Sequence, residues 1–171
     1  NDDLTTSECE GVVIPSNTDL WINSKAGQEL LVSGGDEIEL EAMTKAPAQL
    51  GSVVLTSPGT LNHLTIVIHA VVYGGSRWFP ELEPIEQATF QSLVAARDYG
   101  IKSLALPILG EVNGKCSLEQ IAQAMWKGLH RFLKDFPEPK LEVVKIVIEN
   151  GEALDHFFDA FSIAQEETQG S

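Results

Sequence analysis

The sequence predicts an α/β domain of three layers, in which helices cover both faces of a central mixed, mostly parallel sheet. Apolar runs rich in Val, Ile and Leu alternate along the chain with segments of helical period. Most of these runs are continuously apolar, as expected of strands that are buried on both faces. The length of 171 residues suits one well-buried domain. We therefore expect a single domain over residues 1–164 and a flexible tail over residues 165–171.

Five segments are predicted as strands because they are short, apolar and bounded by turn residues. In chain order they are residues 11–15, 52–57, 64–72, 103–107 and 142–149. The link between the second and third strands is too short for a helical crossover, so these two strands are predicted to be antiparallel neighbours. This pair makes the predicted sheet mixed.

Two helices are predicted ahead of the fourth strand from the signals at their ends. The first opens at Asp36 and carries Glu39 three residues later, which is the spacing of a capping box. The second has Pro84 in its first turn and Gly100 just past its end, the usual positions of these residues. The residues that share its apolar face are Ile85, Thr89, Leu93 and Ala96.

Two more helices are predicted in the last third of the chain. Ser117 and Gln120 form a second capping box at the start of one of them, and its apolar face consists of Ile121, Met125, Leu129 and Phe132. The other begins near residue 151, and its residues predicted to point inward are Leu154, Phe157, Phe158 and Phe161. Apolar side chains at this spacing indicate core packing.

The composition excludes several classes of function. The net charge is −14, from 25 acidic and 11 basic residues, and no basic stripe is present, so we expect no nucleic-acid partner. The apolar runs are too short to span a bilayer, so we expect no membrane association. The two cysteines, Cys9 and Cys116, form no CxxC pair. We therefore expect no metal and no cofactor, and a cytoplasmic location.

A cluster of small polar residues follows the first strand, in the stretch "GVVIPSNTDLW". One interpretation is an ordinary turn, because Asn, Asp and Ser side chains bond their own backbone in turns. The other is a ligand site at the end of a buried strand. Both interpretations stay open for Asn17 and Asp19, which are also the candidates for a catalytic role.

The order of motifs resembles the macro domain family from about residue 3 to residue 161. "DDLTT" is similar to the family's Gly-Asp-Ile-Thr segment, and "GVVIPSNTDL" to its Ala-Ile-Val-Asn-x-Ala-Asn strand end. "VVLTSPGTL" and "TIVIHAV" are similar to its paired strands, and "SLALPILGEVNG" to the strand that leads into its second phosphate loop. The resemblance implies a macro-like fold that binds ADP-ribose or a related NAD-derived nucleotide at the carboxyl ends of the central strands.

The resemblance also implies which residues contact the nucleotide. Asp3 would accept a hydrogen bond from the adenine amine, Asn17 would bond a ribose or diphosphate oxygen, and Asn150 would lie near the adenosine half. We also expect Lys25 to bring positive charge to the phosphates in place of glycine amides. The remaining predicted contacts belong to the two phosphate loops: Ala26, Gly27, Gly110, Val112, Asn113 and Gly114.

Three departures from the family pattern bear on activity. Pro15 stands where hydrolytic relatives have an Asn, and residues 22–25 replace a run that is rich in glycine. In the second phosphate loop, residues 111–113 lack the family's middle glycine and aromatic residue, and Glu111 adds a negative charge. Glycine allows the backbone to approach a diphosphate closely, so we expect weak binding and do not favour catalysis. The alternatives are an ADP-ribosyl or O-acyl-ADP-ribose hydrolase, and a non-binding interaction scaffold within a larger protein. An ADP-ribosylated protein is the alternative ligand.

Three further features have a structural and a functional interpretation. His69 lies inside an apolar strand and is predicted to be a core histidine. Cys116 is predicted to be a small residue near a helix start, with a reactive thiol as the alternative. The loop over residues 73–84 mixes glycines with Arg77, Trp78 and Phe79. Three interpretations stay open: it covers a nucleotide, contacts a protein or lies buried under the helices.

Overall fold

The computed structural model describes residues 4–5, 7–74, 81–110, 116–138, 140–148 and 151–170. In chain order, the elements within these residues are β1 (Gly11–Asn17), α1 (Lys25–Gly34), α2 (Glu37–Met43), β2 (Val53–Thr56), β3 (Ile66–Tyr73), α3 (Leu82–Tyr99), β4 (Ser103–Pro107), α4 (Leu118–Asp135), β5 (Val143–Val147) and α5 (Gly151–Gln169). All five predicted strands form, and their ends differ from the prediction by two residues or fewer.

The strands form one mixed sheet in the order β2-β3-β1-β4-β5. β1 runs parallel to both β3 and β4, and β4 runs parallel to β5. β2 pairs antiparallel with β3, with Val53 opposite Ala70. The predicted mixed, mostly parallel sheet is therefore confirmed, including its antiparallel pair.

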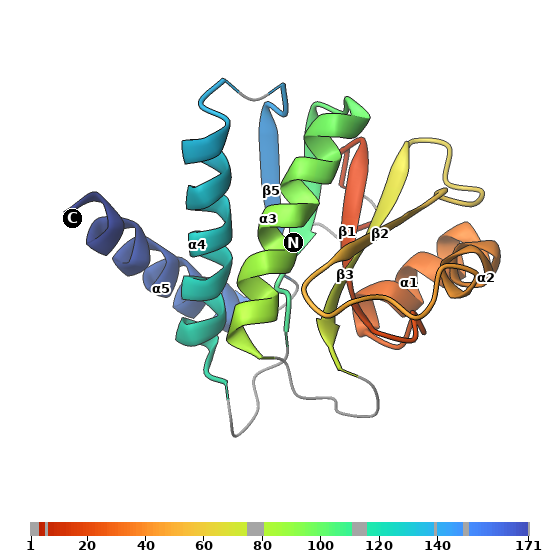
Figure 1. Cartoon of the computed structure of the whole chain (residues 1–171), viewed down its shortest axis with the longest axis horizontal. Coiled ribbons are helices and arrows are strands. Elements are labelled where there is room, and N and C mark those ends of the chain that lie inside the picture. Colours follow the sequence, from red (N-terminus) through yellow and green to blue (C-terminus); the bar gives the residue numbers. More distant parts are fainter. Residues whose placement is uncertain are drawn as a thin grey trace.

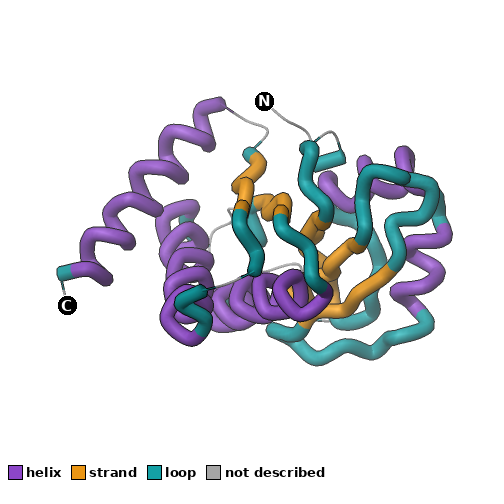
Figure 2. Tube along the Cα trace, turned by 90° about the horizontal axis from the view of Figure 1, so that it is seen from above, coloured by secondary structure: helices purple, strands orange, loops and turns teal. Residues whose placement is uncertain are grey.

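Helices cover both faces of this sheet, as Figures 1 and 2 show. α3, α4 and α5 enclose the larger core cluster, to which β1 contributes Val13 and β4 contributes Leu104. α1, α2 and the segment before β1 enclose a second cluster, to which β1 contributes Val12 and Ile14. Successive residues of β1 thus enter different cores, which explains why this strand is continuously apolar.

The predicted helix ends are confirmed in two of three cases. In α4, the Ser117 hydroxyl accepts a hydrogen bond from the Gln120 amide, and the Gln120 side chain accepts one from the Ser117 amide. α3 ends at Gly100, which has φ +91° and donates its N–H to the last turn. The capping box predicted for Asp36 and Glu39 is wrong, because Asp36 makes no side-chain cap and the Glu39 carboxylate accepts from Ile22 instead.

The predicted apolar faces also hold with one exception. The four residues named on α3 are fully buried, as are Ile121, Met125 and Phe132 on α4, while Leu129 is half-buried. On α5 the inward position predicted for Phe158 is wrong, since its side chain is 60% exposed and Phe157 occupies the core instead. Adjacent helical residues point about 100° apart, so one inward phenylalanine turns its neighbour toward solvent.

α5 extends past residue 164, where we predicted the folded domain to end. Residues 165–169 continue the helix, and Thr168 in its last turn accepts a hydrogen bond from the indole N–H of Trp126 on α4. Among the described residues, no helix is both long and apolar enough to cross a bilayer.

Candidate functional site

The polar cluster after β1 forms a tight turn. The Asn17 side chain is buried, and its Oδ1 accepts hydrogen bonds from the amides of Asp19 at 3.0 Å and Trp21 at 3.2 Å. Leu20 completes the turn with φ +62°, and its amide donates to the Asn17 carbonyl. Asp19 is exposed. The side-chain oxygen of Asn17 is thus engaged within the turn, as the turn interpretation expects.

The pairing of β1 with β3 is irregular at Asn17. The two strands pair regularly up to Ser16 opposite Val71, and then Asn17 lies opposite Tyr73. Val72 is thus an extra residue in β3, which is the pattern of a β-bulge in that strand. The irregularity lies where the chain of β1 enters the turn at Asn17.

The segment after the turn anchors the chain to α1 and α2. Ile22 is 2% exposed, its amide donates to the Glu39 carboxylate at 2.7 Å, and its carbonyl accepts from the Gln28 side chain. A methyl group added to Gly27 would lie 2.3 Å from the Ile22 side chain. Gly27 therefore allows α1 to pack closely on Ile22. Trp21 is 58% exposed.

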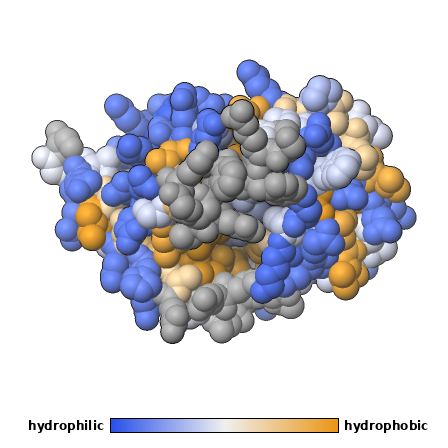
Figure 3. All heavy atoms as spheres, turned by 90° about the horizontal axis from the view of Figure 1, so that it is seen from below, coloured by the Kyte–Doolittle hydropathy of each residue, from blue (hydrophilic) through white to orange (hydrophobic). Residues whose placement is uncertain are grey.

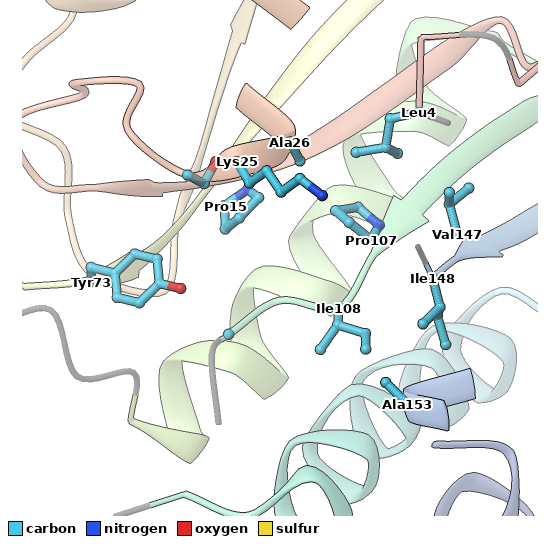
Figure 4. Close-up of a pocket in the computed structure, with 12 residues that line it drawn as sticks. Leu4, Pro15, Lys25, Ala26, Tyr73, Pro107, Ile108, Val147, Ile148 and Ala153 are labelled. Atoms are coloured by element: carbon cyan, nitrogen blue, oxygen red, sulfur yellow. The ribbon is translucent and has the colours of Figure 1, made fainter. Parts of the chain in front are cut away.

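A cavity of about 240 Å³ lies at the carboxyl ends of four strands. Figure 3 looks onto this end of the molecule and shows apolar atoms in the middle of a largely hydrophilic face. Figure 4 shows the pocket itself. Its described lining residues are Leu4, Pro15, Ser24, Lys25, Ala26, Tyr73, Pro107, Ile108, Gly110, Val147, Ile148 and Ala153.

The first turn of α1 gives this pocket its positive charge. Ser24 caps the helix by accepting a hydrogen bond from the Gly27 amide at 3.1 Å. The first amides of a helix have no partners within it and carry the positive end of its dipole. Lys25 is the one charged residue among the described lining, and Figure 4 shows its ammonium group directed into the pocket. The Glu29 carboxylate lies 3.9 Å from this ammonium group.

The rest of the described wall is mostly apolar. Val147 and Ile148 at the end of β5 and Ala153 on α5 form one side. On another side, Figure 4 shows the Tyr73 hydroxyl directed toward the space between the strands. The pocket therefore combines a cationic helix start with a surface that suits an apolar ring.

Three of the predicted contact residues meet in this pocket, namely Lys25, Ala26 and Gly110. Asn17 and Gly27 are buried and are not among its described lining. The other predicted positions lie outside the described residues: Asp3, Val112, Asn113, Gly114 and Asn150. Glu111 and residues 75–80, which include Arg77, also lie outside them.

Sequence reasoning missed several lining residues that a simple signal identifies. Tyr73, Pro107 and Val147 are each the last residue of an apolar strand. Parallel strands bring such residues together at one edge of the sheet. Ser24 was identifiable as the helix cap, because a serine before a helical segment is a preferred N-cap.

His69 is a core histidine, as predicted. It is fully buried, and its Nε2 lies 2.7 Å from the Thr56 hydroxyl. Burial, with a smaller contribution from Lys45, lowers the pKa of His69 from 6.5 to about 4, against an opposing effect of Glu41. His69 is therefore neutral at physiological pH.

Both cysteines are buried, and neither forms a disulfide. Burial raises the pKa of the Cys9 thiol. Within the described part of the chain, no three His, Cys, Asp or Glu side chains are grouped so as to hold a metal ion.

A model of the macro domain family matches residues 13–125, which span β1 to α4 and hence most of the pocket wall. The chain belongs to the macro domain family. An uncharacterized protein of Aeropyrum pernix is 36% identical over 121 residues, which are 71% of this chain and 64% of that protein. One from Aquifex aeolicus is 32% identical over 145 residues, 84% of each chain. The macro domain spans just under two thirds of the A. pernix relative and 44% of one from Mycobacterium tuberculosis.

Solved macrodomains share the fold at low sequence identity. The Oceanobacillus iheyensis macrodomain with MES bound has a TM-score of 0.80 at 15% identity, covering 97% of this chain and 90% of that one. The Trypanosoma brucei macrodomain in complex with ADP has a TM-score of 0.77 at 14% identity, covering 92% of this chain and 65% of that one. These matches confirm the predicted macro-like architecture.

Proposed function

We propose that this macro domain binds ADP-ribose or a related NAD-derived nucleotide in the pocket at the carboxyl ends of its strands. One observation carries the proposal: the only charged residue of the described lining is Lys25, and it stands in the first turn of a helix that opens onto the pocket. Both features favour a phosphate group. Macrodomains from O. iheyensis and T. brucei have been solved with ADP.

The pocket suggests how such a ligand lies. The diphosphate is placed at the start of α1, next to Ser24, Lys25 and Ala26. The adenosine half is placed against Val147, Ile148 and Ala153, whose side chains offer an apolar surface to a base. An ADP-ribosyl group attached to a protein presents the same phosphates and base, so such a protein is a second ligand of the proposed site.

Binding is proposed to be weak, because amides that would bond a diphosphate are already bound within the protein. The Asp19 and Trp21 amides donate to Asn17, and the Ile22 amide donates to Glu39. The groups proposed to contact the phosphates in this part of the pocket are the first turn of α1 and the Lys25 ammonium group, which also lies 3.9 Å from the Glu29 carboxylate. The domain as a whole is also strongly acidic, which opposes an anionic ligand.

Nucleotide binding is favoured over hydrolysis for two reasons. Pro15 lines the pocket where an amide side chain would position water, and its ring has no hydrogen-bonding atom. The Asn17 oxygen is engaged in the turn. Ester hydrolysis needs a positioned water and donors for the leaving oxygen.

Calorimetric titration with ADP-ribose tests this function. We expect a weak, saturable heat for the wild type and about fivefold weaker binding for Lys25→Ala, equivalent to about 1 kcal/mol for one solvent-exposed charge. Lys25→Ala should leave the melting temperature unchanged, because its side chain is 74% exposed. The matched control is Lys134→Ala, which removes an exposed charge near the end of α4.

Each contrary result has a distinct meaning. If no binding heat is detected at millimolar ADP-ribose, the domain does not bind this nucleotide and is better described as an interaction scaffold. If ADP-ribose binds Lys25→Ala as tightly as the wild type, the phosphates do not lie at the start of α1. Release of ADP-ribose from a carboxylate-linked ADP-ribosylated protein would establish hydrolysis in place of simple binding.

A further inference from the structure

A second cavity, of about 380 Å³, lies beside α3 and shares no described lining residue with the nucleotide pocket. Figure 1 shows the segment that joins α2 to β2 reaching toward α3, and the cavity lies where these elements meet α4. Its described lining residues are Gln49, Leu50, Gly51, Ser52, Val53, Gln87, Phe90, Gln91 and Arg131.

The polar lining of this cavity is unusual for so acidic a chain. It contains three glutamine amides, one serine hydroxyl and one guanidinium group, and its described lining includes no acidic residue. The whole sequence has 25 acidic and 11 basic residues. Primary amides both donate and accept hydrogen bonds, and a guanidinium group only donates. Two of these donors are already used, because the Gln87 amide donates to the Glu83 carboxylate at 3.3 Å and the Ser52 hydroxyl donates to the Gln49 carbonyl. The cavity therefore offers the amides of Gln49 and Gln91 beside the positive charge of Arg131.

Arg131 stacks on an aromatic ring, and its described carboxylate partner is not in hydrogen-bond contact. Its guanidinium carbon lies 4.0 Å from the centre of the buried Phe90 ring. The one ion pair described for it joins Nε to Asp135 at 3.9 Å, which is longer than a hydrogen bond. Stacking on an aromatic face fixes the planar group, so fewer side-chain conformations are lost when an anion binds.

Arg97 shows what a neutralised arginine looks like in the same protein. Its guanidinium carbon lies 4.2 Å from the centre of the Phe136 ring, and its Nη1 donates to Asp98 at 2.7 Å. The two arginines share the aromatic support and differ in the carboxylate. Arg97 has a close carboxylate partner, whereas Arg131 faces a cavity.

The wall opposite Arg131 is tightly packed. Gly51 has φ +85°, and a methyl group at this position would lie 2.4 Å from the Gln87 side-chain oxygen. The Gly51 amide donates to Val71 of β3 at 2.7 Å, which ties this wall to the sheet. The cavity is therefore shaped by backbone that the sheet holds in position.

We propose that this cavity is a second binding site, for a carboxylate or phosphate group of a polar ligand. Arg131 binds two oxygens of the anion with its planar fork of donors, and the amide of Gln91 bonds the polar atoms next to it. Paired hydrogen bonds of this kind are the strong ones that arginine makes with oxyanions. The site is independent of the nucleotide pocket.

Amide chemical shifts measured by NMR test the proposal with two probes, sodium phosphate and N-acetyl-glutamate, in separate titrations. We expect saturable shifts of the Gly51 and Ser52 amides with at least one probe. The Lys25 and Ala26 amides report on the nucleotide pocket, so the two sites are read separately. Saturation by phosphate alone assigns a phosphate ligand, and saturation by N-acetyl-glutamate alone assigns a carboxylate ligand.

Variants separate recognition from packing. Arg131→Gln should weaken the saturable binding at least tenfold, whereas Arg97→Gln, which removes a stacked arginine away from the cavity, should leave it unchanged. Arg131→Lys keeps the charge and should bind with intermediate affinity, which also shows that the cavity survives substitution. Shifts that do not saturate with either probe, or that persist in Arg131→Gln, would overturn the proposal.

Discussion

Two groups of polar residues, on β1, β3 and the neighbouring helices, have different surroundings. Asn17, Glu39 and His69 each bond to another part of the protein. Ser24, Lys25 and Tyr73 line the pocket. We call these the interior group and the pocket group. The comparison teaches that a polar cluster after a buried strand identifies the end of that strand, and that backbone geometry decides which residues reach the ligand.

For the interior group we expect effects on the free energy of unfolding, and the largest is the loss of stability as pH falls. Because the pKa of His69 falls from 6.5 to about 4 on folding, the unfolded chain takes up a proton first as pH drops. His69 therefore stabilises the fold fully above pH 6.5, and this contribution is lost between pH 6.5 and 4, for a total of about 3 kcal/mol. Urea unfolding measured at several pH values checks this.

A pair of histidine variants shows whether His69 causes that loss. In His69→Leu, the part of the decline in unfolding free energy between pH 6.5 and 4 that His69 causes should disappear. His63→Ala changes an exposed histidine just before β3 and should show the same decline as the wild type. An unchanged pH profile in His69→Leu would contradict the assignment.

Asn17→Ala is expected to have the next largest effect. It leaves the amides of Asp19 and Trp21 without their acceptor, which costs about 2 kcal/mol of unfolding free energy. Asn17→Asp keeps an acceptor oxygen and should lose much less. If Asn17→Ala instead keeps the unfolding free energy of the wild type and loses ADP-ribose affinity, Asn17 belongs to the pocket group.

Ser24→Ala is expected to have the smallest of these effects on stability. Loss of the helix cap costs about 1 kcal/mol, and it loosens the first turn of α1, so nucleotide affinity should fall as well. Ser24→Asp is the control, because aspartate also caps helices but places a negative charge beside the phosphates. It should retain stability and lose affinity, and retained affinity would contradict a phosphate site at α1.

Much of the fold was predictable because its signals are local. The short link before residue 64 required an antiparallel pair, and Ser117 with Gln120 marked the start of α4. The two failures have different causes. Glu39 bonds the distant Ile22 amide instead of capping its own helix. Phe158 points to solvent because the adjacent Phe157 points into the core.

The site was less predictable than the fold for a related reason. Lys25, Ala26 and Gly110 were found because the resemblance to the macro domain family placed them there. Asn17 could not be assigned from the sequence, because an asparagine after a strand suits a turn as well as a ligand contact, and only the structure shows that its oxygen accepts from Asp19 and Trp21. Residues such as Ile148 and Ala153 reach the pocket only through the arrangement of β5 and α5.

Ile22 belongs to the second core cluster, although it lies in the segment where the resemblance to the family led us to expect glycines. A return to glycine there would free a stretch of backbone for phosphate, but it would also remove a fully buried side chain, at a cost of about 3 kcal/mol or more. Evolution toward tighter nucleotide binding at this position is therefore opposed by folding. In this macro domain a glycine at position 22 would therefore need a compensating change in the hydrophobic layer beneath it.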